Sequence, residues 1–169
     1  SLAKYADGLA KKALSARAYA LQKIGFTNTA PNRAPYYYAE QNWADDAELM
    51  SAALLRMHRK DSGLRAEIAA SAMGFANKEP ITPWLGADTA MHYQWYPFVN
   101  LGHRELAMQL QDERRDTLID FYRQGIEKVW SIAKQNAFYR GVPFIWCSNN
   151  LTVSFAMQCL WYRELTGDN

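Results

Sequence analysis

Three acidic side chains stand close together in the sequence, at Asp45, Asp46 and Glu48. Carboxylates can act as general acids or bases, bind metal ions, or stabilise the N-terminus of a helix. Neighbouring residues on a helix point about 100° apart, so Asp45 and Asp46 cannot act as a facing catalytic pair. We expect Asp45 to cap its helix, Asp46 to serve either capping or function, and Glu48 to lie on the helix surface or in a capping box.

Metal binding has little support in the sequence. Asp45 and Asp46 resemble the start of the metal-binding motif of prenyl synthases. That motif has a further Asp where this chain has Leu49, and no second acidic motif appears. Two cysteines are too few for a disulfide framework or a zinc site. The three histidines show no ligand spacing, and we expect His58 and His103 to be ordinary helix residues. The sequence therefore predicts no metal and no cofactor.

Aromatic residues are the unusual part of the composition, with six Trp and ten Tyr. Many fall in three stretches that precede helices, 36–43, 92–98 and 138–149. Aromatic side chains bury well anywhere, so each of them could simply cover a core. Three such stretches favour a cleft lined by rings, Asn side chains and helix N-termini. Such a cleft suits sugars, and it also suits prenyl chains or other apolar ligands.

Helical periodicity dominates the chain, and no segment shows sustained period-two alternation, so we predict an all-α fold. A long connection is expected at 26–42. Gly102 falls inside one predicted helix, which suggests close helix packing. The last helix is apolar on nearly every side, so we expect it to be central and buried, with Ser148, Asn149 and Asn150 as cap candidates. The predicted helices cover 2–24, 46–57, 64–75, 97–110 and 116–134, and a last helix starts near 149 and ends within 162–168.

The second, fourth and sixth of these helices are more apolar than the others and follow the aromatic stretches. Their starts, near Asp46, Pro97 and Asn149, lie 51 and 52 residues apart. A regular period of this length predicts repeated helical hairpins, which close into α/α toroids or stack into solenoids. Parallel inner helices would bring the three aromatic stretches to one end.

Composition limits the classes of partner. The 169 residues suffice for a single domain, 1–169, with its own core. The net charge is +2 and the basic residues are scattered, so no nucleic acid is expected. No apolar run approaches the roughly 20 residues that a membrane-spanning helix needs, so no membrane span is expected.

In several segments the sequence resembles glycoside hydrolase family 9, the inverting cellulase-like enzymes, and in particular members of the Bacteroides type. The resemblance covers about residues 36–168. It rests on the segments Asn42-Trp43-Ala44-Asp45-Asp46-Ala47-Glu48-Leu49, residues 91–103, Phe138-Tyr139-Arg140-Gly141-Val142-Pro143-Phe144-Ile145-Trp146-Cys147-Ser148-Asn149-Asn150, and Tyr162-Arg163-Glu164-Leu165-Thr166-Gly167-Asp168.

The resemblance implies an (α/α)6 toroid of twelve helices, of which this chain looks like about half. It implies a fragment of a larger catalytic domain that acts on β-1,4-glucan in the periplasm or outside the cell. An inverting glycosidase needs a carboxylic acid and a carboxylate about 6.5–9.5 Å apart. The family's Asp-Ala-Gly-Asp base motif and C-terminal Glu acid are both absent here. We therefore expect no catalytic residue in this chain.

The resemblance instead implies a wall of sugar-binding residues. Trp146 matches a family Trp at the start of an inner helix, and Asp46 matches an Asp at the start of another. Trp95 or Tyr96 matches an aromatic residue at the third. The full set of substrate-binding candidates is Trp43, Asp46, His92, Tyr93, Trp95, Tyr96, Trp146 and Asn149.

Two other classes of function remain open. One is a non-catalytic module of helical hairpins that binds carbohydrate or serves as a scaffold, which would present a concave surface without a deep cleft. The other is a toroid enzyme with an apolar substrate, which would require metal-binding carboxylates that the sequence does not show.

Overall fold

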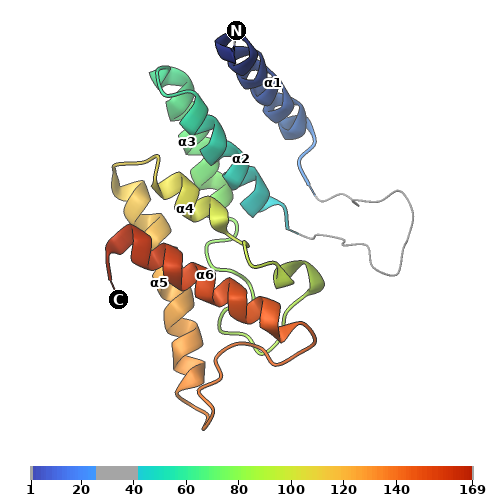
Figure 1. Cartoon of the computed structure of the whole chain (residues 1–169), viewed down its shortest axis with the longest axis vertical. Coiled ribbons are helices and arrows are strands. Elements are labelled where there is room, and N and C mark those ends of the chain that lie inside the picture. The colour runs from blue at the N-terminus through green and yellow to red at the C-terminus, as the bar shows by residue number, and fades with distance from the viewer. Residues whose placement is uncertain (1, 26–41, 169) are drawn as a thin grey trace, which may run out of the picture.

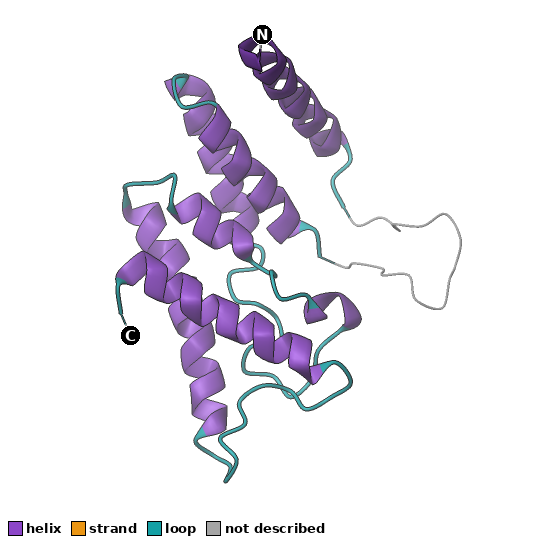
Figure 2. Cartoon of the chain, in the orientation of Figure 1, coloured by secondary structure: helices purple, strands orange, loops and turns teal. Residues whose placement is uncertain are grey.

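The computed structural model describes residues 2–25 and 42–168, and within these ranges it contains helices and no strand (Figure 2). The all-α prediction is therefore confirmed. The predicted connection at 26–42 falls almost entirely outside the described residues. The helices are α1 (Leu2–Gln22), α2 (Ala44–Met57), α3 (Ser62–Ala76), α4 (Leu101–Ala107), α5 (Glu113–Ala133) and α6 (Ser148–Thr166), with a short 3-10 helix η1 (His92–Trp95).

Consecutive helices pack against one another (Figure 1). α2 packs on α3 and α4, α4 packs on α5, and α5 packs on α6. Their contact faces supply the main core, which includes Leu55 of α2, Ile68 of α3, Leu106 of α4 and Leu118 of α5. A second core, centred on the fully buried Trp84, joins the long loop after α3 to α5 and α6.

The fourth helix begins later than predicted. Residues 92–95 form η1, Tyr96 is extended, and Asn100 adopts a left-handed conformation with φ 59°, so α4 starts only at Leu101. The three helix starts at Ala44, Leu101 and Ser148 are 57 and 47 residues apart, so the predicted equal spacing is wrong. A local likeness remains, because Cys147 before α6 has φ 62° and ψ 23°, close to the φ 59° and ψ 26° of Asn100.

Gly102 lies where α4 meets α2, and the expected close packing is confirmed. A Cβ atom at this position would lie 3.0 Å from the carboxyl carbon of Glu48. This distance is tighter than nearly all real Cβ contacts, so a larger residue would have to displace α4 or the Glu48 side chain.

The last helix is not buried on all sides, which corrects the prediction from its composition. Its buried residues, Leu151, Ser154, Gln158 and Trp161, form a single stripe at three- and four-residue steps. Val153 is 49% exposed and Leu160 is 54% exposed. The sequence pattern was misleading because polar Ser154 and Gln158 occupy the buried stripe while apolar residues face outward.

Two predicted helix starts also shift. α5 begins at Glu113, three residues before the predicted start, and Asp112 caps it by accepting a 3.1 Å hydrogen bond from the Arg114 amide. At α6, Cys147 occupies the N-cap position and makes no side-chain cap, while Ser148 and the two following Asn residues lie in the first helical turn.

The first helix matches its prediction in extent but packs only lightly. Leu2, Tyr5 and Leu9 are exposed, and Arg17 is its one buried residue, paired with Glu67 of α3 at 3.0 Å. None of the described helices has the length and apolar character needed to span a membrane.

Candidate functional site

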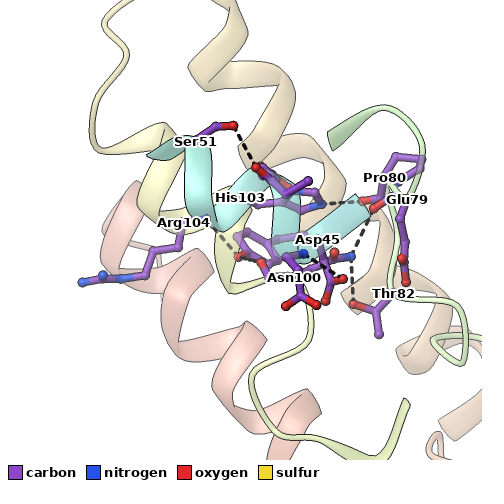
Figure 3. Close-up of polar contacts among 12 residues, drawn as sticks. Asp45, Ser51, Glu79, Pro80, Thr82, Asn100, His103 and Arg104 are labelled. Carbon is purple, nitrogen blue, oxygen red and sulfur yellow. Dashed lines mark hydrogen bonds and ion pairs between the residues drawn. The ribbon is translucent and has the colours of Figure 1, made fainter. Parts of the chain in front are cut away.

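A layer of buried polar side chains surrounds the start of α4 (Figure 3). Asn100 is 1% exposed, and its side-chain amide donates to the Glu79 carbonyl at 3.2 Å and to the Thr82 hydroxyl at 3.3 Å. Tyr122 of α5 donates to the Asn100 carbonyl at 2.6 Å, and Gln158 of α6 donates to Thr82 at 2.7 Å. This network fixes the loop after α3 against three helices.

The second buried contact in this layer joins His103 of α4 to Glu48 of α2. The His103 Nδ1 atom lies 2.9 and 2.8 Å from the two Glu48 oxygens, and its Nε2 atom lies 3.1 Å from the Pro80 carbonyl. A carbonyl can only accept, so Nε2 carries a hydrogen. Glu48 is 0% exposed, so its predicted place on the helix surface is wrong. His103 lies on a helix, as expected, but it is buried there and hydrogen-bonded to Glu48.

Glu79 lies directly before Pro80, and the backbone carbonyls of both residues are held by α4 through Asn100 and His103. Its own side chain is only 6% exposed. Neither carboxyl oxygen of Glu79 has a hydrogen-bond partner within residues 2–25 and 42–168. Burial, followed by the charges of Asp45, Glu48 and Asp46, raises the pKa of Glu79 to about 8.

Asp45 and Asp46 form the first turn of α2, beside Glu79. The Asp45 carboxylate accepts hydrogen bonds from two backbone amides, that of Asp46 at 3.0 Å and that of Asn100. Burial and the charge of Asp46 raise the pKa of Asp45, and burial raises the pKa of Asp46. Asp45 therefore does not occupy the N-cap position predicted for it, which is held by Trp43, although its carboxylate accepts one amide of the first turn. The Asn42 side chain accepts a hydrogen bond from the Ala44 amide at 3.0 Å.

These carboxyl groups line a small cavity of about 100 Å³, which we call the acidic pocket. Liquid water takes roughly 30 Å³ per molecule, so the cavity holds a few waters or one ligand substituent, not a whole drug-sized molecule. Its lining residues are Asn42, Asp45, Asp46, Leu49, Glu79, Tyr93, Tyr96, Phe98, Val99, Leu101 and Gly102.

Three rings next to this pocket form what we call the aromatic corner: His92, Trp95 and Trp146. The Trp95 and Trp146 rings meet edge to face, with centroids 5.0 Å apart and planes at 82°. The His92 ring lies 4.2 Å from Trp95 and 6.2 Å from Trp146. Trp146 is nevertheless 70% exposed, so much of its ring is open to a ligand.

The 3-10 helix η1 connects the two features, because it packs on α6 and carries residues of both. Tyr93, and Tyr96 just after η1, line the acidic pocket together with Asp46. His92 and Trp95 belong to the aromatic corner with Trp146. Six of the eight predicted candidates therefore gather around η1.

The other two predicted candidates lie outside both features. Trp43 packs edge to face on Phe75, with ring centroids 6.0 Å apart, and the Lys78 ammonium lies 4.4 Å from its ring centre. Asn149 is exposed in the first turn of α6 and lines neither the pocket nor the corner.

Glu79 is the main residue that the sequence prediction missed. The only local feature of the sequence that could have indicated a functional role for Glu79 is its place before Pro80, in a loop bounded by proline residues. Its burial depends on contacts with α4, about 20 residues further along the chain. No group of three His, Cys, Asp or Glu side chains among the described residues is arranged to hold a metal ion.

Comparison with models of known protein families, with curated proteins and with solved structures gave no match.

Proposed function

We propose that this chain forms part of an inverting glycoside hydrolase acting on β-1,4-glucan-type polysaccharide, and that it contributes a sugar-binding surface. The proposal assigns no catalytic residue to the chain. It places the described helices in about half of an (α/α)6 toroid of an enzyme that works in the periplasm or outside the cell. The family resemblance suggests this class, and the geometry around η1 supplies the physical support.

The observation that carries the proposal is the exposed ring of Trp146, held edge to face against Trp95. An edge-to-face contact fixes the orientation of an indole while leaving one face open. Sugar rings present C–H groups on one face and hydroxyl groups around the edge. A fixed, exposed aromatic face beside polar side chains matches both parts of such a ligand.

The acidic pocket adds hydrogen-bonding groups next to this face. Asp46 and Tyr93 line it, and carboxylates and phenolic hydroxyls accept hydrogen bonds from sugar hydroxyls. The outward apolar residues of α6, Val153 and Leu160, fit a toroid in which further helices pack against this one. An apolar substrate is less well supported, because the pocket beside the corner contains three carboxyl groups.

Binding of cellohexaose to the chain, followed by isothermal titration calorimetry and tryptophan fluorescence, tests the proposal. We expect Trp146→Ala to weaken binding by about tenfold or more, since stacking on the open ring is lost. Trp130→Ala is the matched control, because Trp130 is 52% exposed but stacks on Tyr139 at the far end of α5.

A chain that is folded by circular dichroism but binds no cello-oligosaccharide would favour the scaffold alternative over the sugar-binding one. Equal losses from Trp146→Ala and Trp130→Ala would contradict a specific role for the aromatic corner.

A further inference from the structure

The acidic pocket is unusual because its carboxyl groups face no cation from residues 2–25 or 42–168. Asp45, Asp46 and Glu79 line it, and among the described residues no Lys, Arg or His side chain belongs to its lining. None of the ion pairs found in the described parts of the chain includes any of these three residues. Carboxylates that gather without a counter-charge repel one another, and a bound cation would relieve that repulsion.

Glu79 gives a second and independent indication of a ligand. It is more than nine-tenths buried, and neither of its oxygens has a partner among the described residues. A buried carboxyl group without a hydrogen bond is costly to a fold. The fold nevertheless holds Glu79 firmly, because Asn100 and His103 anchor the backbone on either side of the Glu79–Pro80 bond.

The size and walls of the pocket indicate which kind of cation would fit. A cavity of about 100 Å³ accepts a small charged substituent. The Tyr93, Tyr96 and Phe98 rings in its lining are of the type that attracts organic cations. A bare metal ion is disfavoured, because no three acidic or imidazole groups in the described chain are arranged to coordinate one.

We propose that the acidic pocket binds the ammonium group of an amino sugar, within a β-1,4-linked glycan whose neighbouring ring stacks on Trp146. This inference rests on the proposed sugar-binding function and specifies its substrate class. The geometry allows one glycan to reach both features, since Tyr93 and Trp95 are two residues apart on η1, about 4 Å along a 3-10 helix.

Charge coupling gives the binding a distinctive signature. The ionisable groups around Glu79 are Asp45, Asp46 and Glu48 of α2, Tyr93 of η1, and His103, which pairs with Glu48 from α4. A neutral Glu79 carboxyl group loses its proton more easily once an ammonium group sits in the pocket. Binding of an amine therefore releases protons, while binding of a neutral sugar at the same surface does not.

Calorimetry with two matched ligands tests the inference: cellotriose, and the trimer of β-1,4-linked glucosamine, compared at about pH 6.5 and low salt. We expect the glucosamine trimer to bind about tenfold more tightly or better, with a heat that depends on the buffer because protons are released. The Asp45→Asn/Asp46→Asn double variant and Glu79→Gln should each reduce this preference. Asp116→Asn, which removes an exposed carboxylate on α5, should leave it unchanged.

The outcomes separate this inference from the proposed function. Equal affinity for the two trimers, or a preference that survives both sets of variants, overturns the amino-sugar inference and leaves the sugar-binding proposal standing. Failure of both trimers to bind overturns the amino-sugar inference and the sugar-binding proposal together. Circular dichroism of each variant shows whether a lost preference reflects lost binding or lost folding.

Discussion

Two glutamates in this protein are buried to almost the same degree and yet have opposite surroundings. Glu48 is 0% exposed, and both of its oxygens contact the His103 ring nitrogen. Glu79 is 6% exposed, and its oxygens have no partner among the described residues. A paired buried carboxylate can support a fold, whereas an unpaired one costs free energy that some other gain must offset. We infer that Glu48 serves the packing of α2 on α4, and that Glu79 serves a ligand.

The positions of the two residues in the fold agree with this division. Glu48 lies in a helix, opposite Gly102, which has no side chain to occupy the space of its carboxyl group. Glu79 lies in the loop after α3, and loops held on a rigid scaffold often carry binding residues. The same α4 residue, His103, contacts Glu48 and the carbonyl next to Glu79, so one side chain supports both sites.

Removal of the paired carboxylate should have the largest effect on stability. We expect Glu48→Ala to lower the free energy of unfolding by about 3–5 kcal/mol, because it leaves His103 buried without its partner. Urea denaturation followed by circular dichroism measures this change. Glu67→Ala is the matched control: its partner is Arg17, but the Glu67 side chain is 66% exposed, so we expect a loss below about 1 kcal/mol. Similar losses in the two variants would contradict the claim that the buried contact of Glu48 with His103 stabilises the fold more than an exposed ion pair does.

Removal of the unpaired carboxyl group, Glu79, should raise the free energy of unfolding, and the size of this gain should depend on pH. The pKa of Glu79 is raised from its ordinary value of 4.5 to about 8 in the folded chain, so between these values the folded state keeps a proton that the unfolded state has lost. Its contribution to stability therefore falls as pH rises from about 4.5 to about 8 and is constant above that.

Replacement by an amide removes this pH dependence. We expect Glu79→Gln to match the parent chain near pH 5 and to exceed its stability by a few kcal/mol at pH 9. Urea denaturation at both pH values measures the difference. A variant that is less stable than the parent at pH 9 would mean that Glu79 has a stabilising partner.

The close approach beside Glu48 gives a smaller effect. Gly102→Ala places a methyl group about 3.0 Å from the Glu48 carboxyl carbon, and we expect a loss of about 1–3 kcal/mol. Gly74→Ala in α3 is a suitable control, since its added Cβ meets nothing within 4 Å and Ala favours a helix by up to about 1 kcal/mol. Thermal unfolding should move in opposite directions for the two variants, and a neutral Gly102→Ala would show that Glu48 has room to shift.

The charges of Asp45 and Asp46 should make small contributions to the raised pKa of Glu79. Asp45→Asn should lower the pKa of Glu79 more than Asp46→Asn does, because the Asp45 charge contributes more to its elevation. Carboxyl-carbon NMR titration of the two variants measures the order. An unchanged pKa in both would show that neither Asp contributes, and that burial and the Glu48 charge account for the elevation.

Much of the fold could be predicted from local pattern, and much of the site could not. The periodic apolar residues of α2, α3 and α5 place these helices within a few residues of their observed ends. The start of α4 was missed because a left-handed Asn100 and the turn around Pro97 interrupt a sequence that looks helical. The aromatic residues around η1 were selected by type and by resemblance.

The roles of the two glutamates depend on contacts that sequence spacing does not encode. Glu48 lies in the buried stripe of α2, four residues from both Ala44 and Ala52, and it was expected on the surface because it is charged. The missing side chain at Gly102 leaves room for its carboxyl group under α4. Glu79 is buried because Asn100 and His103 anchor its loop from a distant helix. A polar residue is easily placed on a helix from sequence, but its burial is a property of the packed structure.

The most direct test of this account is a carboxyl-carbon NMR titration of Glu79, alone and with a saturating amount of the β-1,4-glucosamine trimer. The account predicts a pKa of about 8 for the free chain, falling when the amine is bound. A pKa near the ordinary value of 4.5 in the free chain, or one that the amine leaves unchanged, would contradict the claim that Glu79 is held without a partner for a ligand to complete.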